Sequence, residues 1–239
     1  MSYDEPYTFN PIGIIHSCYK QKFGIPRQPG LVKQATAELI INTELSKPEV
    51  FRGIEQYSHL WLIFVFHQSI RKSEKITVRP PRLGGKEKLG VFATRSNFRP
   101  NPIGQSVVKF EGIDTSSKQY VLKLSGGDLL HETPILDLKP YIPYADVIID
   151  AVAGFASQPP EKLYQVSFSE DVLQQIDSAS IELNTKLKPF ISELLSYDPR
   201  PAFFQDKHDG KSYAMYLYNR NLQWNIVGNR VQVIDFSTI

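Results

Sequence analysis

The spacing of hydrophobic and polar positions is that of β-strands over most of the first 140 residues. Apolar residues recur at every second place in several short segments, and each predicts a strand: 12–15, 38–42, 75–79, 91–94, 106–113 and 119–124. Residues 59–67 (HLWLIFVFH) are almost continuously apolar, which predicts a central strand covered on both faces. The one helix predicted in this part spans 48–56 and begins with proline. Many strands with almost no intervening helices favour an antiparallel barrel or sandwich.

After residue 150 the spacing changes to that of helices. Residues 151–165 lack a helix or strand pattern and predict a linker, after which Ser169 predicts a helix start. Apolar stripes predict two helices, and alternating residues from 213 to 233 then predict a β meander with a two-residue turn at 228–229. The expected fold class is therefore mainly β (α+β overall). An antiparallel β-barrel domain spans 1–150, and a small α+β domain spans 151–239.

Composition narrows the class of protein. Of the 239 residues, 41% are hydrophobic and 22% are charged, which provides a sizeable core and excludes a largely disordered chain. The one cysteine, Cys18, excludes an intramolecular disulfide and a four-thiolate zinc site. The longest apolar run, 60–66, is too short to span a bilayer, and the N-terminus lacks the pattern of a secretory signal. We expect a cytoplasmic protein with no membrane partner.

Positive charge is concentrated in one segment. Residues 71–99 hold nine Lys/Arg and two Asp/Glu, a net charge of +7 in a chain whose net charge is only +2. Such a cluster indicates a phosphate-bearing partner. From charge alone, however, a solvated lysine- and arginine-rich surface explains the segment better.

Two stiff loops place arginine side chains where a small anionic ligand could use them. Residues 26–31 (PRQPGL) hold Arg27 and Gln28 between prolines, which reduces the entropy lost on binding. Residues 94–104 (TRSNFRPNPIG) carry Arg95 and Arg99, and guanidinium groups suit a carboxylate or a phosphate. A rigid structural turn explains the first loop equally well.

A third loop, residues 125–131 (SGGDLLH), combines two glycines with a carboxylate. The glycines permit close approach of the backbone to a ligand, and Asp128 could accept hydrogen bonds from a ribose diol. An ordinary β-turn explains the same glycines. The chain lacks the glycine-rich nucleotide motifs and the G-x-S-x-G elbow. His59 and His67 would lie about 26 Å apart along one strand, so no metal is expected.

The motifs together resemble the TsaA-like family. The residues that carry the resemblance are PRQPGL at 26–31, YSHLW at 57–61, FVFHQ at 64–68, VRPPRLGG at 78–85, GVFATRSNFRPNPIG at 90–104, TPILDLKPY at 133–141 and DPRPA at 198–202. They extend over nearly the whole chain, and the combination is far more specific than any single loop.

The resemblance implies a methyltransferase that uses S-adenosyl-L-methionine as methyl donor. The implied substrate is threonylcarbamoyladenosine at position 37 in the tRNA anticodon stem-loop, which is methylated at N6. The implied architecture is a homodimer of β-barrel cofactor domains, with the donor bound near the subunit interface. The implied cofactor contacts are Pro26, Arg27, Gln28, His67, Gln68, Arg95, Asp128, Leu129, Leu130 and His131.

The sequence departs from the family pattern before Thr133. The family usually has Asp-Gly there, whereas this chain has His131-Glu132, so a flexible glycine and a carboxylate are both replaced. No catalytic base is assigned, because the carbamoyl group already acidifies the acceptor N–H.

Two other classes of function remain open. One is a non-catalytic RNA-binding module, and the other is an enzyme or binding protein for a different adenosine derivative.

Overall fold

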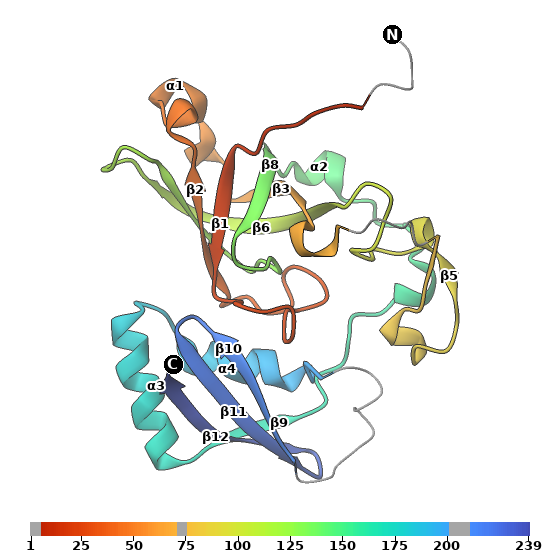
Figure 1. The fold of residues 1–239 in the computed structure, drawn as a ribbon, viewed down its shortest axis with the longest axis vertical. Coiled ribbons are helices and arrows are strands. Elements are labelled where there is room, and N and C mark those ends of the chain that lie inside the picture. The colour runs from red at the N-terminus through yellow and green to blue at the C-terminus, as the bar shows by residue number, and fades with distance from the viewer. Residues whose placement is uncertain (1–5, 71–75, 201–210) are drawn as a thin grey trace.

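The computed structural model describes residues 6–70, 76–200 and 211–239. Its larger part is a closed barrel of antiparallel strands in the order β1-β2-β7-β6-β3-β8, shown in Figure 1. The strand bounds are β1 Gly13–Ser17, β2 Thr36–Ile41, β3 His59–Val65, β6 Ile103–Asp114, β7 Val121–Ser125 and β8 Thr133–Pro140. The predicted fold class is confirmed.

Alternation along the strands fills the barrel. In β3, Leu60, Leu62 and Phe64 are buried in the interior, whereas the residues between them are only partly buried. The expectation that this strand is fully covered on both faces is therefore wrong. The outer face of β3 is covered in part by α2 (Pro143–Asp146), where Trp61 Nε1 donates a hydrogen bond of 3.0 Å to Asp146.

Three local predictions for the barrel part are corrected. The helix expected over 48–56 is broken into α1 (Pro48–Phe51) and the 3₁₀ turn η2 (Ile54–Gln56), because Gly53 between them has a φ of +90°. The strand expected over 91–94 is the 3₁₀ turn η5 (Val91–Ala93), closed by Thr94, whose N–H and hydroxyl both donate to the Val91 carbonyl. Strand β8 was not predicted as a strand.

An arm projects from the barrel between β3 and β6. It contains a two-stranded sheet of β4 (Thr77–Val78) and β5 (Leu89–Gly90), with the 3₁₀ turn η4 (Pro81–Leu83) between them. Arg82 donates a hydrogen bond to the carbonyl of Gln158, which follows the 3₁₀ turn η6 (Gly154–Ala156). The described part of the predicted basic segment, 76–99, lies in this arm and the loop after it. Residues 71–75 lie outside the described residues.

The smaller part is an open four-stranded sheet in the order β10-β11-β12-β9. Its elements are β9 Gln165–Phe168, α3 Glu170–Glu182, α4 Leu187–Ser196, β10 Ser212–Leu217, β11 Arg220–Val227 and β12 Arg230–Thr238. Ser169 caps α3 by accepting from Val172 N–H, and a two-residue turn joins β11 to β12, as predicted. Strand β9, parallel to β12, was not predicted.

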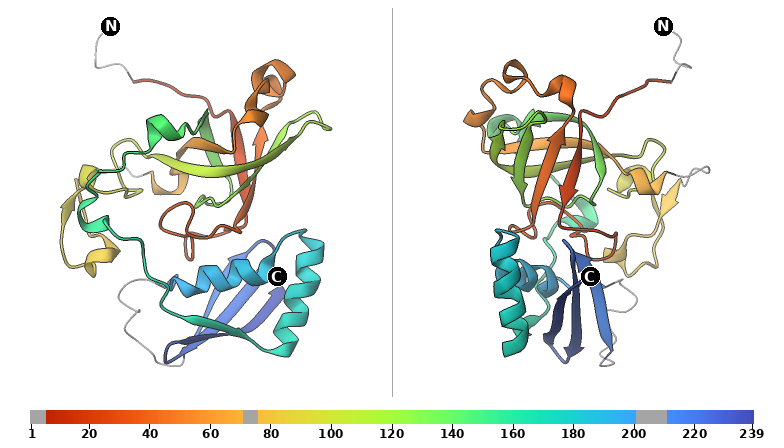
Figure 2. Two further views of the ribbon diagram at one scale, coloured as in Figure 1. Left: turned by 180° about the vertical axis from the view of Figure 1, so that it is seen from behind. Right: turned by 60° about the vertical axis from the view of Figure 1, so that its left-hand side comes forward.

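Helices α3 and α4 cover one face of this sheet, as the views in Figure 2 show. Their predicted apolar stripes point inward, with Ile176, Phe190 and Leu195 fully buried. The same core also contains four residues of the connection between β1 and β2: Cys18, Tyr19, Val32 and Ala35. The barrel and the open sheet are therefore joined through this connection as well as through the chain after residue 150.

Candidate functional site

The three predicted loops lie at one end of the barrel because of its antiparallel order. When neighbouring strands run in opposite directions, the ends of β1, β7 and β3 lie beside the starts of β2, β6 and β8. The loop at 26–31 joins β1 to β2, the loop at 125–131 joins β7 to β8, and the loop at 94–104 leads into β6. Sequence segments a hundred residues apart therefore meet at one edge.

Direct contacts join these loops. Gly30 N–H donates to Gly126 O at 2.8 Å, which ties the first loop to the third. Arg95 Nη1 donates to Gln28 Oε1 at 2.6 Å, which ties the second loop to the first. The charge of Arg95 also acts on the carboxyl group of Asp128. The structure thus brings together the predicted residues Gln28, Arg95 and Asp128.

The 3₁₀ turn η3 (His67–Ser69), which follows β3, completes one side of the site. It is held to the second loop by a hydrogen bond of 2.7 Å from Asn97 Nδ2 to Ser69 Oγ. Lys22 Nζ donates to the backbone carbonyl of Gln68. This hydrogen bond holds the turn against the segment that leads into the first loop. Burial lowers the pKa of His67, and the nearby Glu132 carboxylate opposes that shift.

Of the two arginines in the second loop, only Arg95 is directed to the other loops. Arg99 Nη1 donates to the carbonyls of Thr94 at 3.0 Å and Ser96 at 3.3 Å, so its guanidinium closes its own loop. One nitrogen of Arg99 is engaged within its own loop, whereas one nitrogen of Arg95 is engaged by the first loop. Arg99 stiffens the loop that presents Arg95.

The loop also depends on a glycine at its end. A Cβ atom at Gly104 would lie 2.3 Å from Cε2 of Phe64 and 2.9 Å from Cζ of Phe66. These two rings pack edge to face with their centroids 5.2 Å apart. A residue without a side chain is therefore required where the second loop enters β6.

The surroundings of Asp128 change the pKa of its carboxyl group. Ser106 Oγ donates to Asp128 Oδ1 at 2.6 Å. Burial raises the pKa of Asp128 to about 6, although the hydrogen bond from Ser106 and the charge of Arg95 both favour the carboxylate. A carboxyl group with this pKa is ionised at neutral pH and becomes protonated in mildly acidic solution.

The rest of the third loop is held by its backbone. The Leu129 carbonyl accepts from Ser17 Oγ at 2.7 Å, and the Leu130 carbonyl accepts from Thr133 Oγ1 at 2.7 Å. Both leucine side chains are buried, and that of Leu129 belongs to the barrel core. After Gly127, the polar side chains of this loop are therefore those of Asp128 and His131.

His131 lies beside His16, with ring centroids 5.0 Å apart. Its backbone N–H donates to Tyr19 O at 2.8 Å. Burial lowers the pKa of His131, and the charge of Lys20 contributes in the same direction. Its Nδ1 is buried and has no hydrogen-bond partner among the described residues, so it is a polar atom that a ligand could satisfy.

Glu132 keeps the turn in spite of lacking the glycine expected there. It has a φ of +63°, in the left-handed region that glycine favours. Its N–H donates to Ile15 O at 2.8 Å, and Thr133 N–H donates to Leu130 O. Backbone hydrogen bonds thus hold the loop in a glycine-like conformation without a glycine.

The charges that act on Arg27 come from outside the three loops. Burial lowers its pKa, the carboxylate of Asp198 opposes that shift, and the charge of Arg82 adds to it. Its side chain still reaches solvent. Pro26, immediately before it, is partly buried and fixes the backbone there.

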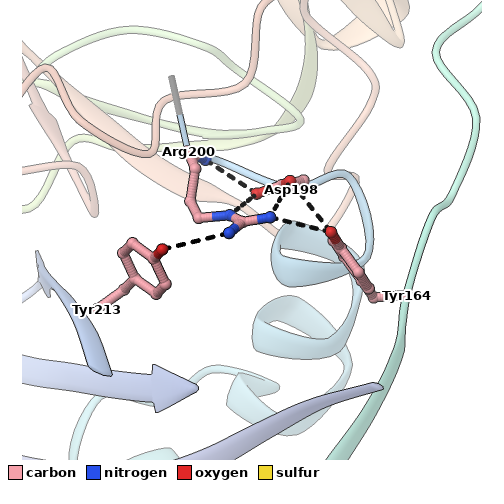
Figure 3. A network of polar contacts seen from close by, with 4 residues as sticks. All are labelled: Tyr164, Asp198, Arg200 and Tyr213. Atoms are coloured by element: carbon pink, nitrogen blue, oxygen red, sulfur yellow. Dashed lines mark hydrogen bonds and ion pairs between the residues drawn. The ribbon is translucent and has the colours of Figure 1, made fainter. Parts of the chain in front are cut away.

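Asp198, to which Arg27 responds, belongs to a buried polar network that sequence reasoning missed (Figure 3). Arg200 Nε donates to Asp198 Oδ1 at 2.8 Å, and neither side chain is exposed to solvent. The remaining guanidinium nitrogens donate to the hydroxyl groups of Tyr164 at 3.0 Å and Tyr213 at 3.3 Å. The motif at 198–202 was a signal for this network, but its spacing alone predicted no contacts.

Metal binding finds no support in the part of the chain that the structure describes. No group of three or more His, Cys, Asp and Glu side chains there could hold a metal ion. In that same part, no helix is long and apolar enough to cross a bilayer.

Comparison with known proteins identifies the family. The model of the tRNA-methyltransferase O N-terminal domain matches residues 14–147, and that of the TrmO C-terminal domain matches residues 161–239. This chain belongs to the tRNA-methyltransferase O family. The resemblance inferred from the motifs is confirmed.

Relatives along the whole length of the chain agree with this family. A tRNA (adenine(37)-N6)-methyltransferase of Escherichia coli is 44% identical over 220 residues, covering 92% of this chain and 93% of the relative. A putative S-adenosylmethionine-dependent methyltransferase of Pseudomonas aeruginosa is 43% identical and covers 92% of both. The crystal structure of the tRNA-methyltransferase O of P. aeruginosa matches with a TM-score of 0.82 at 37% identity, covering both chains completely.

Proposed function

We propose that this chain is an S-adenosyl-L-methionine-dependent methyltransferase that modifies N6 of adenosine 37 in tRNA, with threonylcarbamoyladenosine as the acceptor. The junction of three loops around Gln28, Arg95 and Asp128 carries this proposal. The printed names of the E. coli and P. aeruginosa relatives support the activity and the cofactor.

The residues at the junction fit the parts of the cofactor. Arg95 uses one nitrogen on Gln28, and its remaining N–H groups suit the carboxylate of the methionine moiety. The carboxylate of Asp128 suits the ribose diol, and the backbone of the loop at 128–131 suits the adenine edge. Nδ1 of His131 provides a further polar atom, and the remaining proposed contacts are Pro26, Arg27, His67, Gln68, Leu129 and Leu130.

The protein's part in the reaction is alignment. Held by Arg95, Asp128 and the loop at 128–131, S-adenosylmethionine would supply an electrophilic methyl group, whose bond to sulfur would break as the bond to N6 forms. The N6 proton passes to solvent water, because the carbamoyl group makes that N–H acidic. The stiff loops hold the acceptor and donor in line, which is the largest contribution that such a site can make.

The arm and the loop after it suit tRNA phosphates. Arg79, Arg82, Lys86 and Lys88 are all exposed there, and within residues 76–99 only Glu87 carries negative charge. Backbone contacts of this kind provide affinity and orientation without sequence choice. Specificity would then come from the splayed anticodon-loop base at the loop junction.

We further propose that the protein acts as a cytoplasmic homodimer, with a barrel domain over 1–150 and a C-terminal domain over 151–239. The segment after β8 supports the dimer, because its large apolar side chains are between 37% and 97% exposed. A contiguous exposed apolar stretch of this kind marks a contact surface. Its members are Ile142, Tyr144, Val147, Ile148, Ile149, Val152 and Phe155.

A methyl-transfer assay tests the activity. The protein is incubated with S-adenosylmethionine carrying a deuterated methyl group and tRNA from cells that lack the endogenous enzyme, and the nucleosides are analysed by mass spectrometry. We expect label on threonylcarbamoyladenosine alone. Arg95→Ala should lower the transfer about 10- to 100-fold when S-adenosylmethionine is not saturating. Lys139→Ala, a surface change at the opposite end of β8, should leave it unchanged.

The other outcomes distinguish the alternatives. If the protein binds tRNA but neither binds S-adenosylmethionine nor transfers label, it is an RNA-binding module. If label or turnover appears on a different adenosine derivative, the site is correct and the acceptor is not.

A further inference from the structure

The segment between β1 and the first loop belongs to the C-terminal sheet more than to the barrel. Cys18 and Tyr19 are buried in the core that α3, α4 and the open sheet form, and Phe23 and Ile25 pack against it. The barrel has a separate core, made from its own strands and the turns that cover it. The chain therefore leaves the barrel at Ser17, crosses the C-terminal core and returns at β2, carrying the loop at 26–31 with it.

Backbone contacts connect this segment to both sides. Tyr19 pairs with Leu217 of β10, the edge strand of the open sheet, and Tyr218 N–H donates to Cys18 O at 2.8 Å. On the other side, Tyr19 O accepts from His131 N–H at 2.8 Å. A short path of backbone hydrogen bonds thus runs from the edge of the C-terminal sheet to the third loop of the site.

A stack of aromatic rings supports the first loop in the same way. Phe23 stacks on Trp224, with centroids 6.2 Å apart and ring planes 10° apart. Trp224 in turn stacks on Tyr213 at 5.9 Å, and the hydroxyl group of Tyr213 accepts from Arg200. The network in Figure 3 is therefore connected, through Tyr213 and then Trp224, to the ring of Phe23 in the segment that leads into the first loop.

Gly24 fits the backbone closely onto the sheet. It has a φ of +88°, and a Cβ atom there would lie 2.7 Å from Sδ of the buried Met215. The backbone conformation therefore favours glycine, and a side chain there would also displace the end of the Met215 side chain. Two residues later the chain reaches Pro26 and the candidate cofactor loop.

We propose that the C-terminal sheet positions the cofactor loops, and that Phe23 and Gly24 are the positioning residues through which it does so. Neither residue contacts the cofactor in this account. They fix the position of Gln28. Because Arg95 donates a hydrogen bond to Gln28, they also fix the position of Arg95. The proposal rests on the proposed function in one respect, because S-adenosylmethionine is taken as the ligand of these loops.

Phe23→Ala tests the proposal in the full-length chain, with two readouts. The first is the dissociation constant for S-adenosylmethionine measured by calorimetry, which should rise about 3- to 30-fold for a positioning change of this kind. The second is hydrogen exchange at the amides of Gly30 and His131, which should become faster because both hydrogen bonds depend on the seated segment. Phe23→Tyr keeps the stacked ring and should restore both values.

Phe168→Ala is the matched control. Phe168 is also partly buried against the C-terminal core, but it lies on β9, at the opposite edge of the sheet from β10. Its removal should lower stability without changing cofactor affinity or exchange at the two loop amides. If Phe23→Ala and Phe168→Ala behave alike in both readouts, the positioning role is wrong.

The two proposals fail in different ways. If the wild type does not bind S-adenosylmethionine, the proposed function fails, and exchange at the Gly30 and His131 amides still decides the positioning role. If the wild type binds and Phe23→Ala changes neither affinity nor exchange, the proposed function stands and the positioning role is overturned.

Discussion

The barrel and the C-terminal sheet complete their cores in different ways. The barrel closes on itself, and its interior is filled mainly by aliphatic side chains from its own strands. The C-terminal sheet is open, is covered on one face by two helices, and has a core that also includes Cys18, Tyr19, Val32 and Ala35 from the barrel's β1–β2 connection. The barrel therefore completes its core with its own residues, whereas the C-terminal sheet needs a segment of the barrel to complete its core.

This difference places the candidate site where the two parts depend on each other. A closed barrel leaves no free strand edge, so its binding residues lie on the loops at one end. The open sheet has an edge strand, β10, and the segment at 18–19 covers that edge. The loop that carries Gln28 extends from that same segment, and the N–H of His131 donates to its Tyr19 carbonyl. We therefore expect changes in the C-terminal core to reach the site more readily than equal changes in the barrel core.

The largest effect is expected from the buried ion pair of the C-terminal part. Arg200→Ala removes one partner of a fully buried ion pair and leaves the Asp198 carboxylate buried without that partner, which should cost about 3–5 kcal/mol in the free energy of unfolding. Urea unfolding followed by circular dichroism measures this cost. Lys162→Ala, which removes the exposed partner of the ion pair with Glu193 in the same part, is the control and should change the midpoint little. Equal effects of the two variants would contradict the account.

Two core leucines compare the parts directly. Leu62 in the barrel and Leu222 in the C-terminal sheet are both fully buried, so Leu62→Ala and Leu222→Ala should each cost about 2–5 kcal/mol. Only Leu222→Ala should also speed hydrogen exchange at the Tyr218 amide, which bonds to Cys18 O. Faster exchange there in both variants would mean that the two cores are not distinct.

Arg95 in the second loop and Arg79 on the arm should separate cofactor binding from tRNA binding. Arg95→Ala should weaken S-adenosylmethionine binding about 10- to 100-fold, the cost of losing hydrogen bonds to a charged group. Calorimetric titration measures the change. Arg79→Ala, on the exposed arm, should leave that affinity unchanged while weakening tRNA binding. A loss of cofactor affinity in Arg79→Ala would move the cofactor site to the arm.

Asp128 should make cofactor binding depend on pH. Its pKa is about 6, so the carboxylate that suits the ribose is present above that value and is lost below it. Affinity should be constant above pH 6 and fall up to about tenfold for each pH unit below it. In Asp128→Asn this dependence should disappear, although His67 and His131 are still present. A persistent dependence in that variant would assign it to a histidine.

The raised pKa of Asp128 has the opposite effect on the stability of the fold: stability falls as the pH rises, whereas cofactor affinity rises. The pKa of Asp128 is raised from 3.8 to about 6, so the folded chain binds this proton more tightly than the unfolded chain does. The stabilisation contributed by the protonated group is complete below pH 3.8 and is lost as the pH rises to about 6.

The smallest effect is expected at the helix cap of the C-terminal part. Ser169→Ala removes the side chain that accepts from Val172 N–H and should cost about 1 kcal/mol without changing cofactor affinity. Thermal unfolding measures the change. A change in affinity would show that the position of α3, and not only that of β10, controls the site.

The sequence predicted elements where local patterns were sufficient. The stripes of α3 and α4 and the alternation of β10 to β12 repeat regularly, and each matched an element. Three barrel features were not captured by the spacing of apolar residues, two because of local backbone geometry and one because of long-range pairing. Gly53 interrupts the predicted helix, Thr94 closes a turn in place of a strand, and β8 is a strand because it pairs with β1 and β3.

The candidate site was predictable in its residues more than in its geometry. Glycine and proline content singled out the three loops, but only the antiparallel order of the barrel brings Gln28 to Arg95. The segment at 18–25 was not singled out, because a ring stack and a close glycine contact with a distant strand leave no local pattern. The sequence showed that Glu132 replaces the family's glycine but not what conformation it takes; backbone hydrogen bonds hold it at a positive φ.

A double-mutant cycle tests most directly whether the loops form one cofactor site. The dissociation constant for S-adenosylmethionine is measured for the wild type, Gln28→Ala, Arg95→Ala and the double variant. Because the two side chains share a hydrogen bond of 2.6 Å, the double variant should lose much less affinity than the product of the two single losses. Losses that simply multiply would show that the two loops act independently and would contradict a single shared site.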